Sequence, residues 1–345
     1  MIDDLKYIHQ RDGQDALGIA EKQYQQLSYQ FDPGDLSEIR QPLDNVVFAG
    51  MGGSAIAGLM SRTWPAGAQV PFEVCRQYHV PGYVSEKTLF IASSYSGNTE
   101  ETVNGLAEAE AKGAKIVVIA GGGKLIEIAE QKNYPHVVLP KVGQPRYAVL
   151  YSFNALVTVL EKLGLAKEGS LEELKKAAPF LEAAQKDWLP TVASDNNSAK
   201  KLALELLGKS IVIYAGPLMS PAAYKWKISF NENAKNIAWW NEYPEWNHNE
   251  TSGWLEQPRE KPYAVVELRS SLEHPQVQKR YEVMAKLLSG KRPFANAVQA
   301  KGETELEQML WTIVFGDFTS LYLALLNNVD PSPVDVQERI KVELS

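Results

Sequence analysis

Hydroxyl side chains gather in the short stretch SSYSGNTEET, residues 93–102, between an apolar run and a segment with helical periodicity. Ser94, Ser96 and Thr99 precede a helix predicted from Glu100, and the unpaired N–H groups at a helix start attract anions. Serine and threonine also commonly cap helices, and one of these side chains is expected to do so. Together with Ser93 these residues supply four hydroxyls, more than are needed to cap one helix, so the stretch predicts an anion site.

A glycine-rich turn, GMGGSAIAG at residues 50–58, follows the first predicted strand. Gly52 and Gly53 allow a backbone to come close to a ligand, and Ser54 adds a hydroxyl near the next helix start. The turn could instead be a tight connection whose glycines serve packing. It also imitates the G-x-G-x-x-A fingerprint of dinucleotide-binding proteins, with Glu73 about 20 residues further on, where the ribose-binding acid would stand.

The two turns together favour a phosphomonoester over a dinucleotide. Loops that follow parallel strands open on one edge of the sheet, so both turns are expected to face one pocket. A dinucleotide does not require a hydroxyl-rich second loop, whereas a phosphomonoester with exposed terminal oxygens gains from several neutral donors. The chain contains no G-x-x-x-x-G-K-[ST] sequence, which disfavours a nucleoside triphosphatase.

Short apolar runs alternate with helical segments around these turns, which predicts an α/β fold with parallel sheets flanked by helices on both faces. After an amphipathic leading helix over residues 12–30, strands are predicted at 46–49, 72–75, 88–92, 115–119 and 137–139, and later at 211–216, 263–268 and 294–299. The similar stretches VVFAG and IYAG, at 46–50 and 213–216, indicate duplication of one α/β unit. We place an N-terminal domain at 1–165, a helical connector at 166–208 and a second domain at 209–345.

Composition excludes several classes of protein. The chain has 45% hydrophobic and 22% charged residues, as soluble globular proteins do, and we find no apolar run near the roughly 20 residues that span a bilayer. The net charge of -7 disfavours a nucleic-acid partner. Cys75 is the single cysteine, and residues 1–6 lack the pattern of a signal peptide, so a reducing cytoplasm is expected.

The sequence resembles sugar isomerase (SIS) domain proteins and, more narrowly, the bifunctional phosphoglucose/phosphomannose isomerases. The resemblance rests on motifs in both halves: Gly52-Gly53-Ser54, Ser94 to Glu101, Pro145-Arg146, Asn231 to Lys235, Pro244-Glu245 with His248-Asn249-Glu250, Gly316-Asp317, and Asp330-Pro331-Ser332-Pro333 before Lys341. It implies two SIS domains, each with a five-stranded parallel sheet of the doubly wound, flavodoxin-like type. It also implies a homodimer with active sites near the subunit contact.

The resemblance further implies a cofactor-independent aldose-ketose isomerase that interconverts glucose 6-phosphate, and mannose 6-phosphate, with fructose 6-phosphate through a cis-enediol. Glu232 would be the base, Arg146 would stabilise the enediolate, and His248, supplied by the neighbouring subunit, would open the sugar ring. Lys341 matches the family's C-terminal lysine, with Arg339 as the alternative register. The phosphate would bind Gly52, Gly53, Ser54, Ser94, Ser96 and Thr99. Ser332 stands where the family often has threonine, which puts the use of mannose 6-phosphate in doubt.

Three alternatives compete with this interpretation. A zinc-dependent isomerase is disfavoured because the five histidines are scattered and no H-E-x-x-H motif is present, so no metal is expected. A non-catalytic SIS protein that senses sugar phosphates would need the phosphate turns but not Glu232, His248 and Arg146 together. A nucleotide-dependent oxidoreductase would rest on the imitated glycine fingerprint alone.

Overall fold

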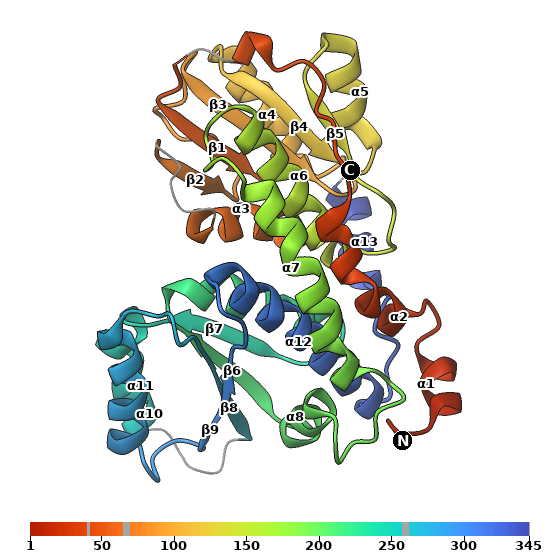
Figure 1. The fold of residues 1–345 in the computed structure, drawn as a ribbon, viewed down its shortest axis with the longest axis vertical. Helices are drawn as coiled ribbons and strands as arrows, with labels where there is room; N and C mark the ends of the chain where they lie inside the picture. Colours follow the sequence, from red (N-terminus) through yellow and green to blue (C-terminus); the bar gives the residue numbers. More distant parts are fainter. Residues whose placement is uncertain (40–41, 65–69, 257–261, 345) are drawn as a thin grey trace. The chain divides into compact units, whose positions relative to one another are not determined.

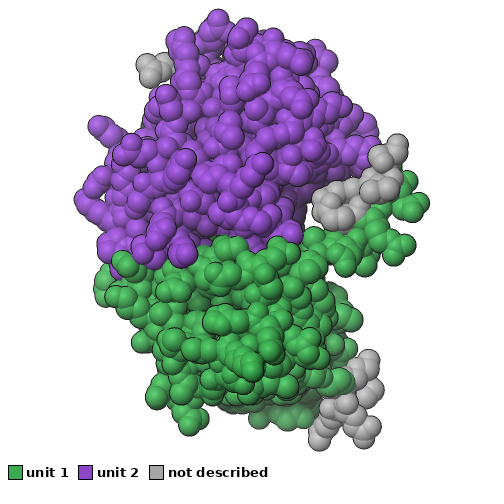
Figure 2. All heavy atoms as spheres, turned by 90° about the vertical axis from the view of Figure 1, so that its right-hand side faces the viewer, with its two compact units in different colours: residues 1–21, 181–345 green, residues 22–180 purple. Residues whose placement is uncertain are grey.

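The computed structural model describes residues 1–39, 42–64, 70–256 and 262–344. The chain divides into two compact units. The first unit consists of residues 22–180 (purple, keyed as unit 2 in Figure 2), and the second unit consists of residues 1–21 together with 181–345 (green, keyed as unit 1). The expected class, α/β with two parallel sheets flanked by helices, is confirmed. The compact units divide the chain differently from the predicted domains, because residues 1–21 and most of the predicted connector pack with the second sheet.

The unit of residues 22–180 is built on a parallel sheet whose order, in the described part of the chain, is β2-β1-β3-β4-β5 (Figure 1). Its strands are β1 (Asn45–Ala49), β2 (Phe72–Cys75), β3 (Thr88–Ser94), β4 (Lys115–Ala120) and β5 (His136–Val138). Each strand predicted in the first half of the sequence is found within two residues of its expected bounds. The central strand β3 is buried along its whole length, as expected for a sheet covered on both faces.

Helices follow the strands of this unit in the expected alternation. They are α3 (Gly52–Thr63), α4 (Glu100–Ala111), α5 (Gly123–Lys132), α6 (Val149–Lys162) and α7 (Ser170–Gln185), with short 3-10 turns η1 (Gln23–Ser28), η2 (Ser37–Ile39) and η3 (Pro145–Tyr147). The boundary between the units falls inside α7, just after Pro179. A proline within a helix removes a backbone hydrogen bond, so this is a natural place for the chain to pass from one unit to the other.

The second unit is built on a parallel sheet with the order β7-β6-β8-β9 among the residues described. Its strands are β6 (Ser210–Ala215), β7 (Ala238–Glu242), β8 (Tyr263–Arg269) and β9 (Ala295–Gln299). The family resemblance implied five strands, but after β9 the chain enters a helix at a capping box formed by Thr304 and Glu307. β7 is a further correction, because no strand was predicted between residues 216 and 263. β7 is an edge strand, and most of its side chains are half-buried. Buried and exposed residues therefore do not alternate clearly along it.

The helices of the second unit come from both ends of the sequence. They are α1 (Leu5–Arg11), α2 (Ala16–Glu21), α8 (Ser198–Leu206), α9 (Ser220–Glu232), α10 (Glu250–Glu256), α11 (Pro275–Leu287), α12 (Glu305–Leu326) and α13 (Asp335–Leu344), with 3-10 turns η4 (Lys186–Trp188), η5 (Pro217–Met219) and η6 (Glu245–His248). The single leading helix predicted over residues 12–30 is therefore wrong. The Asp12 carboxylate accepts hydrogen bonds from the Ala16 and Leu17 amides at the start of α2, and the helix ends before Lys22, which belongs to the other unit.

α12 is the core helix of the second unit. Within the described residues it is the one helix long and apolar enough to span a membrane by length and composition, although no such run was expected from the sequence. Its apolar window is 94% buried inside the protein, against α2, α8 and α9. The apolar composition of α12 is thus accounted for by packing on all sides.

Candidate active site

The hydroxyl turn after β3 forms a compact cluster at the carboxyl edge of the first sheet. Ser94 Oγ lies 2.7 Å from Thr99 Oγ1 and 3.4 Å from Ser96 Oγ, and it also accepts a hydrogen bond from the Gly97 amide. Ser94 is buried, whereas Thr99 is half-buried and Ser96 is exposed. The cluster therefore extends from the buried end of β3 to solvent beside the start of α4, a place where an anion can bind.

Helix capping does not account for these hydroxyls. Thr99 occupies the N-cap position of α4, but within the described part of the chain its hydroxyl pairs with Ser94 and not with an N–H group of the helix. The expected side-chain cap is therefore wrong for Thr99. The Ser96 hydroxyl accepts from the Asn98 amide, outside the helix. The first N–H groups of α4 thus remain directed at the space beside the cluster, where they favour an anion.

The glycine turn after β1 comes into close contact with the hydroxyl turn. Ser54, near the start of α3, accepts a hydrogen bond from the Tyr95 amide at 3.1 Å, which joins the two loops directly. A Cβ atom at Gly50 would lie 3.0 Å from the Ser93 carbonyl oxygen, so a larger residue would push the two loops apart by a few tenths of an ångström. Gly52 is the first residue of α3 and has a φ of +49, and a Cβ atom added to it would have no neighbour within 4 Å. The two turns therefore meet at one edge of the sheet, as predicted, and a pocket shared by them stays a prediction.

Arg146 is brought to the same glycine turn. It lies in η3, and a Cβ atom at Gly53 would come within 3.2 Å of the Arg146 amide nitrogen. Gly53 thus allows the segment that carries Arg146 to lie against the start of α3. The Arg146 side chain is buried, and its guanidinium stacks 4.8 Å from the centre of the Tyr147 ring. An arginine oriented by an aromatic ring can present fixed donors to a developing negative charge.

Glu232 is the last residue of α9 in the second unit, and it is half-buried. The following Asn233 is buried and donates from Nδ2 to Ser320 Oγ of α12 at 2.9 Å. Just before Glu232, Asn231 Oδ1 accepts from the Ala238 amide at the start of β7. Packing and hydrogen bonds on both sides therefore hold the end of α9 that carries the proposed base.

His248 ends η6, in the same unit as Glu232, and is exposed on the single chain. The residue before it, Asn247, accepts a hydrogen bond from Arg280 Nη1 of α11 at 3.1 Å, which holds this turn against the helix. Trp246, two residues before His248, is buried and stacks on Tyr214 with ring centres 4.2 Å apart. Lys341 lies within α13, but its side chain falls outside the described residues.

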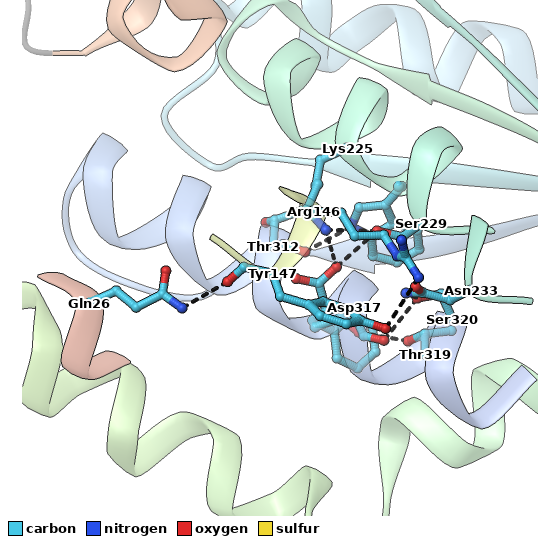
Figure 3. A network of polar contacts seen from close by, with 12 residues as sticks. Gln26, Arg146, Tyr147, Lys225, Ser229, Asn233, Thr312, Asp317, Thr319 and Ser320 are labelled. Carbon is cyan, nitrogen blue, oxygen red and sulfur yellow. Dashed lines mark hydrogen bonds and ion pairs between the residues drawn. The ribbon is translucent and has the colours of Figure 1, made fainter. Parts of the chain in front are cut away.

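A buried polar network between α9 and α12 was not assigned a role from the sequence (Figure 3). Lys225 and Asp317 form a fully buried ion pair, and Ser229 Oγ accepts from Lys225 Nζ at 2.8 Å and donates to Asp317 Oδ1 at 2.9 Å. Ser320 Oγ donates to the Asp317 carbonyl and accepts from Asn233. The network fixes the carboxyl-terminal half of α9 to α12. The sign of this network in the sequence is Lys225, a charged residue among the largely apolar residues 224–230.

A cavity of about 520 Å³ in the first unit lies away from the two turns. It is lined at the amino end of β1 by Asp44 and Asn45 and includes Glu73 and Tyr83. Glu73 accepts a hydrogen bond from the Tyr83 hydroxyl, and burial together with this carboxylate raises the pKa of Tyr83. Glu73 pairs with Val47 in the middle of β1, and its carboxylate is engaged by Tyr83. It therefore does not lie at the carboxyl end of β2, where a ribose-binding acid would stand, which weakens the dinucleotide interpretation.

No metal centre is evident among the residues that the structure describes, where no three His, Cys, Asp or Glu side chains gather closely enough to hold an ion. Cys75 is buried, and burial raises the pKa of its thiol, which disfavours the reactive thiolate.

Comparison with known proteins finds SIS-domain families in both halves of the chain. The SIS domain family matches residues 39–160, and the family described as the bacterial phospho-glucose isomerase C-terminal SIS domain matches residues 195–344. The fold resembles that of a glucose-6-phosphate isomerase like protein from Thermus thermophilus, with a TM-score of 0.66 and 19% identity over 100% of this chain and 99% of that one. At this identity the likeness concerns the fold alone.

Two curated relatives are similar over most of their length. The bifunctional phosphoglucose/phosphomannose isomerase of Caldicellulosiruptor bescii is 37% identical over 88% of this chain and 91% of its own. The protein of the same name from Aquifex aeolicus is 32% identical over 91% of this chain and 95% of its own. The chain therefore belongs to the family of bifunctional phosphoglucose/phosphomannose isomerases.

Proposed function

We propose that the protein interconverts glucose 6-phosphate and mannose 6-phosphate with fructose 6-phosphate through a cis-enediol, without a cofactor. The observation that carries the proposal is the hydroxyl cluster of Ser94, Ser96 and Thr99, joined to Ser54, at the starts of two helices. Neutral donors at helix starts suit a phosphomonoester, and both curated relatives are named for isomerases of phosphosugars.

Each proposed catalytic residue has a chemical role in the transfer of a proton between C1 and C2. Glu232 accepts the proton from one carbon and returns it to the other, and Arg146 stabilises the negative charge of the enediolate. His248 donates to the ring oxygen and accepts from the anomeric hydroxyl, because imidazole can do both near neutral pH. Lys341 assists at the same site from α13 by the family resemblance.

The central experiment is an isomerase assay on purified protein in the presence of a chelator and without added nucleotide. Fructose 6-phosphate is expected to be converted to glucose 6-phosphate, and Glu232→Gln is expected to lower kcat by about 10² to 10⁴. Mannose 6-phosphate is assayed beside it, because Ser332 stands where the family often has threonine. Binding of fructose 6-phosphate without turnover, unaffected by Glu232→Gln, would instead support a protein that senses sugar phosphates.

We further propose that the protein is a cytoplasmic homodimer in which His248 of the partner subunit completes each site. The exposure of His248 on the single chain supports this proposal. Glu232→Gln and His248→Ala, each nearly inactive alone, are mixed after unfolding and refolding together. Random pairing should restore about a quarter of the wild-type activity, because one site of each mixed dimer receives both intact residues. No recovery, with dimers present by light scattering, would place His248 and Glu232 of one chain in the same site.

A further inference from the structure

Lys235 is exposed, and its ammonium group donates to several backbone carbonyl oxygens. Nζ donates to the carbonyls of Glu232 at 2.7 Å, Pro333 at 2.8 Å and Asp330 at 3.0 Å, and the Pro331 carbonyl lies 3.3 Å away. A lysine has three N–H donors, and the three shortest contacts use all of them. All these residues belong to the same compact unit. This side chain therefore joins the end of α9 to residues 330–333.

The backbone at Lys235 is also unusual. Its φ is +52, in the left-handed region that favours glycine, and it lies three residues beyond the end of α9. The Asn236 amide donates back to the Phe230 carbonyl at 3.0 Å, which closes the helix end around this residue. A strained backbone persists where the surroundings require it, and such positions concentrate at functional sites. The turn at Lys235 is what directs its side chain back toward residues 330–333.

The segment that receives the ammonium contains two prolines. Pro331 and Pro333 have no N–H group, so their backbone can accept hydrogen bonds but cannot donate them. The Ser332 amide donates to the Asp330 side chain at 2.9 Å, a local turn within the segment. Pro331 and Ser332 are buried, and α13, which carries Lys341, begins at Asp335. The position of residues 330–333 also sets where α13 starts.

We propose that Lys235 is a positioning residue for isomerisation: it holds residues 330–333, and with them the start of α13, in fixed register with Glu232. The inference rests on the proposed function for the role of Glu232. The Glu232 carbonyl accepts from Lys235 Nζ, so the residue proposed as base is itself one of the tethered points. An ammonium is also favoured at this place because the carboxyl end of a helix carries partial negative charge.

Glycine and methionine variants separate the ammonium from the backbone conformation. Lys235→Gly removes the ammonium and accepts the left-handed φ without strain, so the relief of backbone strain should offset part of the stability lost with the hydrogen bonds. Lys235→Met keeps a long apolar side chain and removes the charge. Lys235→Arg keeps the charge, but a planar guanidinium does not direct three donors from one nitrogen and should not rescue the loss. Lys201→Met, at an exposed position of α8, is the matched control.

Lys235→Gly and Lys235→Met are expected to lower kcat about 10- to 100-fold, since a misplacement of about 1 Å at a catalytic group has effects of this size. KM for fructose 6-phosphate should change less than about threefold, because the proposed phosphate cluster lies in the other unit. Hydrogen exchange measured by mass spectrometry should become faster over residues 326–336 and remain unchanged in α4. Lys201→Met should behave as wild type in all three measurements.

The outcomes distinguish this inference from the proposed function. Wild-type kcat in Lys235→Gly, alongside a large loss in Glu232→Gln, would overturn the positioning role and leave the isomerase proposal standing. Full activity of Lys235→Arg would overturn the requirement for three donors on one nitrogen, because it would show that a positive charge at this position suffices to hold residues 330–333. If Glu232→Gln retained full activity, the assignment of Glu232 as the base would be wrong. In that case the role of Lys235 would be decided by hydrogen exchange: unchanged exchange over residues 326–336 in Lys235→Gly would show that Lys235 does not hold this segment.

Discussion

The buried ion pair between Lys225 and Asp317 leads to a quantitative prediction. The two side chains are 0% and 1% exposed, and Asp317→Leu would leave the ammonium with the Ser229 hydroxyl but without its counter-charge. Removing one member of a buried pair typically costs about 3 to 5 kcal/mol, because a charge is left unpaired away from water. The unit that contains the pair has about 190 residues, for which 1 kcal/mol shifts the Tm by about 2 to 4 °C. Asp317→Leu should therefore lower the Tm of this unit by about 6 to 20 °C.

Urea unfolding followed by tryptophan fluorescence can test this prediction, because Trp226 and Trp311 lie on α9 and α12 beside the network. The double variant Lys225→Met with Asp317→Leu should recover stability to within about 1 kcal/mol of the wild type, since apolar replacements of a buried pair are often neutral. A loss below about 1 kcal/mol in Asp317→Leu would refute the reasoning. A double variant no more stable than the single one would show that packing, and not an unpaired charge, caused the loss.

Three further predictions concern other parts of the molecule. Ser94→Ala combined with Thr99→Val should raise KM for fructose 6-phosphate at least about tenfold with a smaller change in kcat, measured by steady-state kinetics, because about 1.4 kcal/mol corresponds to a factor of ten. Gly97→Ala should lower the unfolding free energy of residues 22–180, since φ is +71 and the added Cβ would lie 1.6 Å from the Gly122 carbonyl oxygen. Burial raises the pKa of Glu273. The unfolding free energy of the wild type should therefore fall as the pH rises from the unfolded-state pKa of about 4.3 through the raised folded-state pKa. Urea titrations at several pH values should show this fall in the wild type but not in Glu273→Gln.

The sheets could be predicted from the sequence because their central strands are nearly continuous apolar runs bounded by glycine-rich or polar turns. β3 and β4 are examples, and both were found close to their predicted bounds. β7 was missed because an edge strand is buried on few positions: in Ala238–Glu242 the tryptophan at 239 is exposed. Its aromatic and amide residues therefore carried neither a helical period nor a clear alternation.

The phosphate cluster was also predictable, because hydroxyls and glycines at helix starts indicate an anion site by local chemistry alone. Ser94 and Ser54 lie 40 residues apart, and parallel-sheet topology was sufficient to place their loops on one edge. The contacts that hold Glu232 were not predictable in this way. Lys225 with Asp317 and Lys235 with residues 330–333 join segments more than 90 residues apart, and no periodic pattern in the sequence indicates which distant partner a charged residue will have.

The discontinuous second unit has a consequence for the order in which the protein is made. Residues 1–21 leave the ribosome before residues 22–180, yet the apolar face of α2, formed by Ala16, Leu17 and Ala20, packs on α12, which is synthesised after them. Residues 22–180 can fold before α12 is made. Once folded, they form a compact insert instead of a flexible loop of about 160 residues, and this lowers the entropy cost of bringing residues 1–21 to residues 181–345. Deleting the first 21 residues should therefore damage the half of the protein that is translated last.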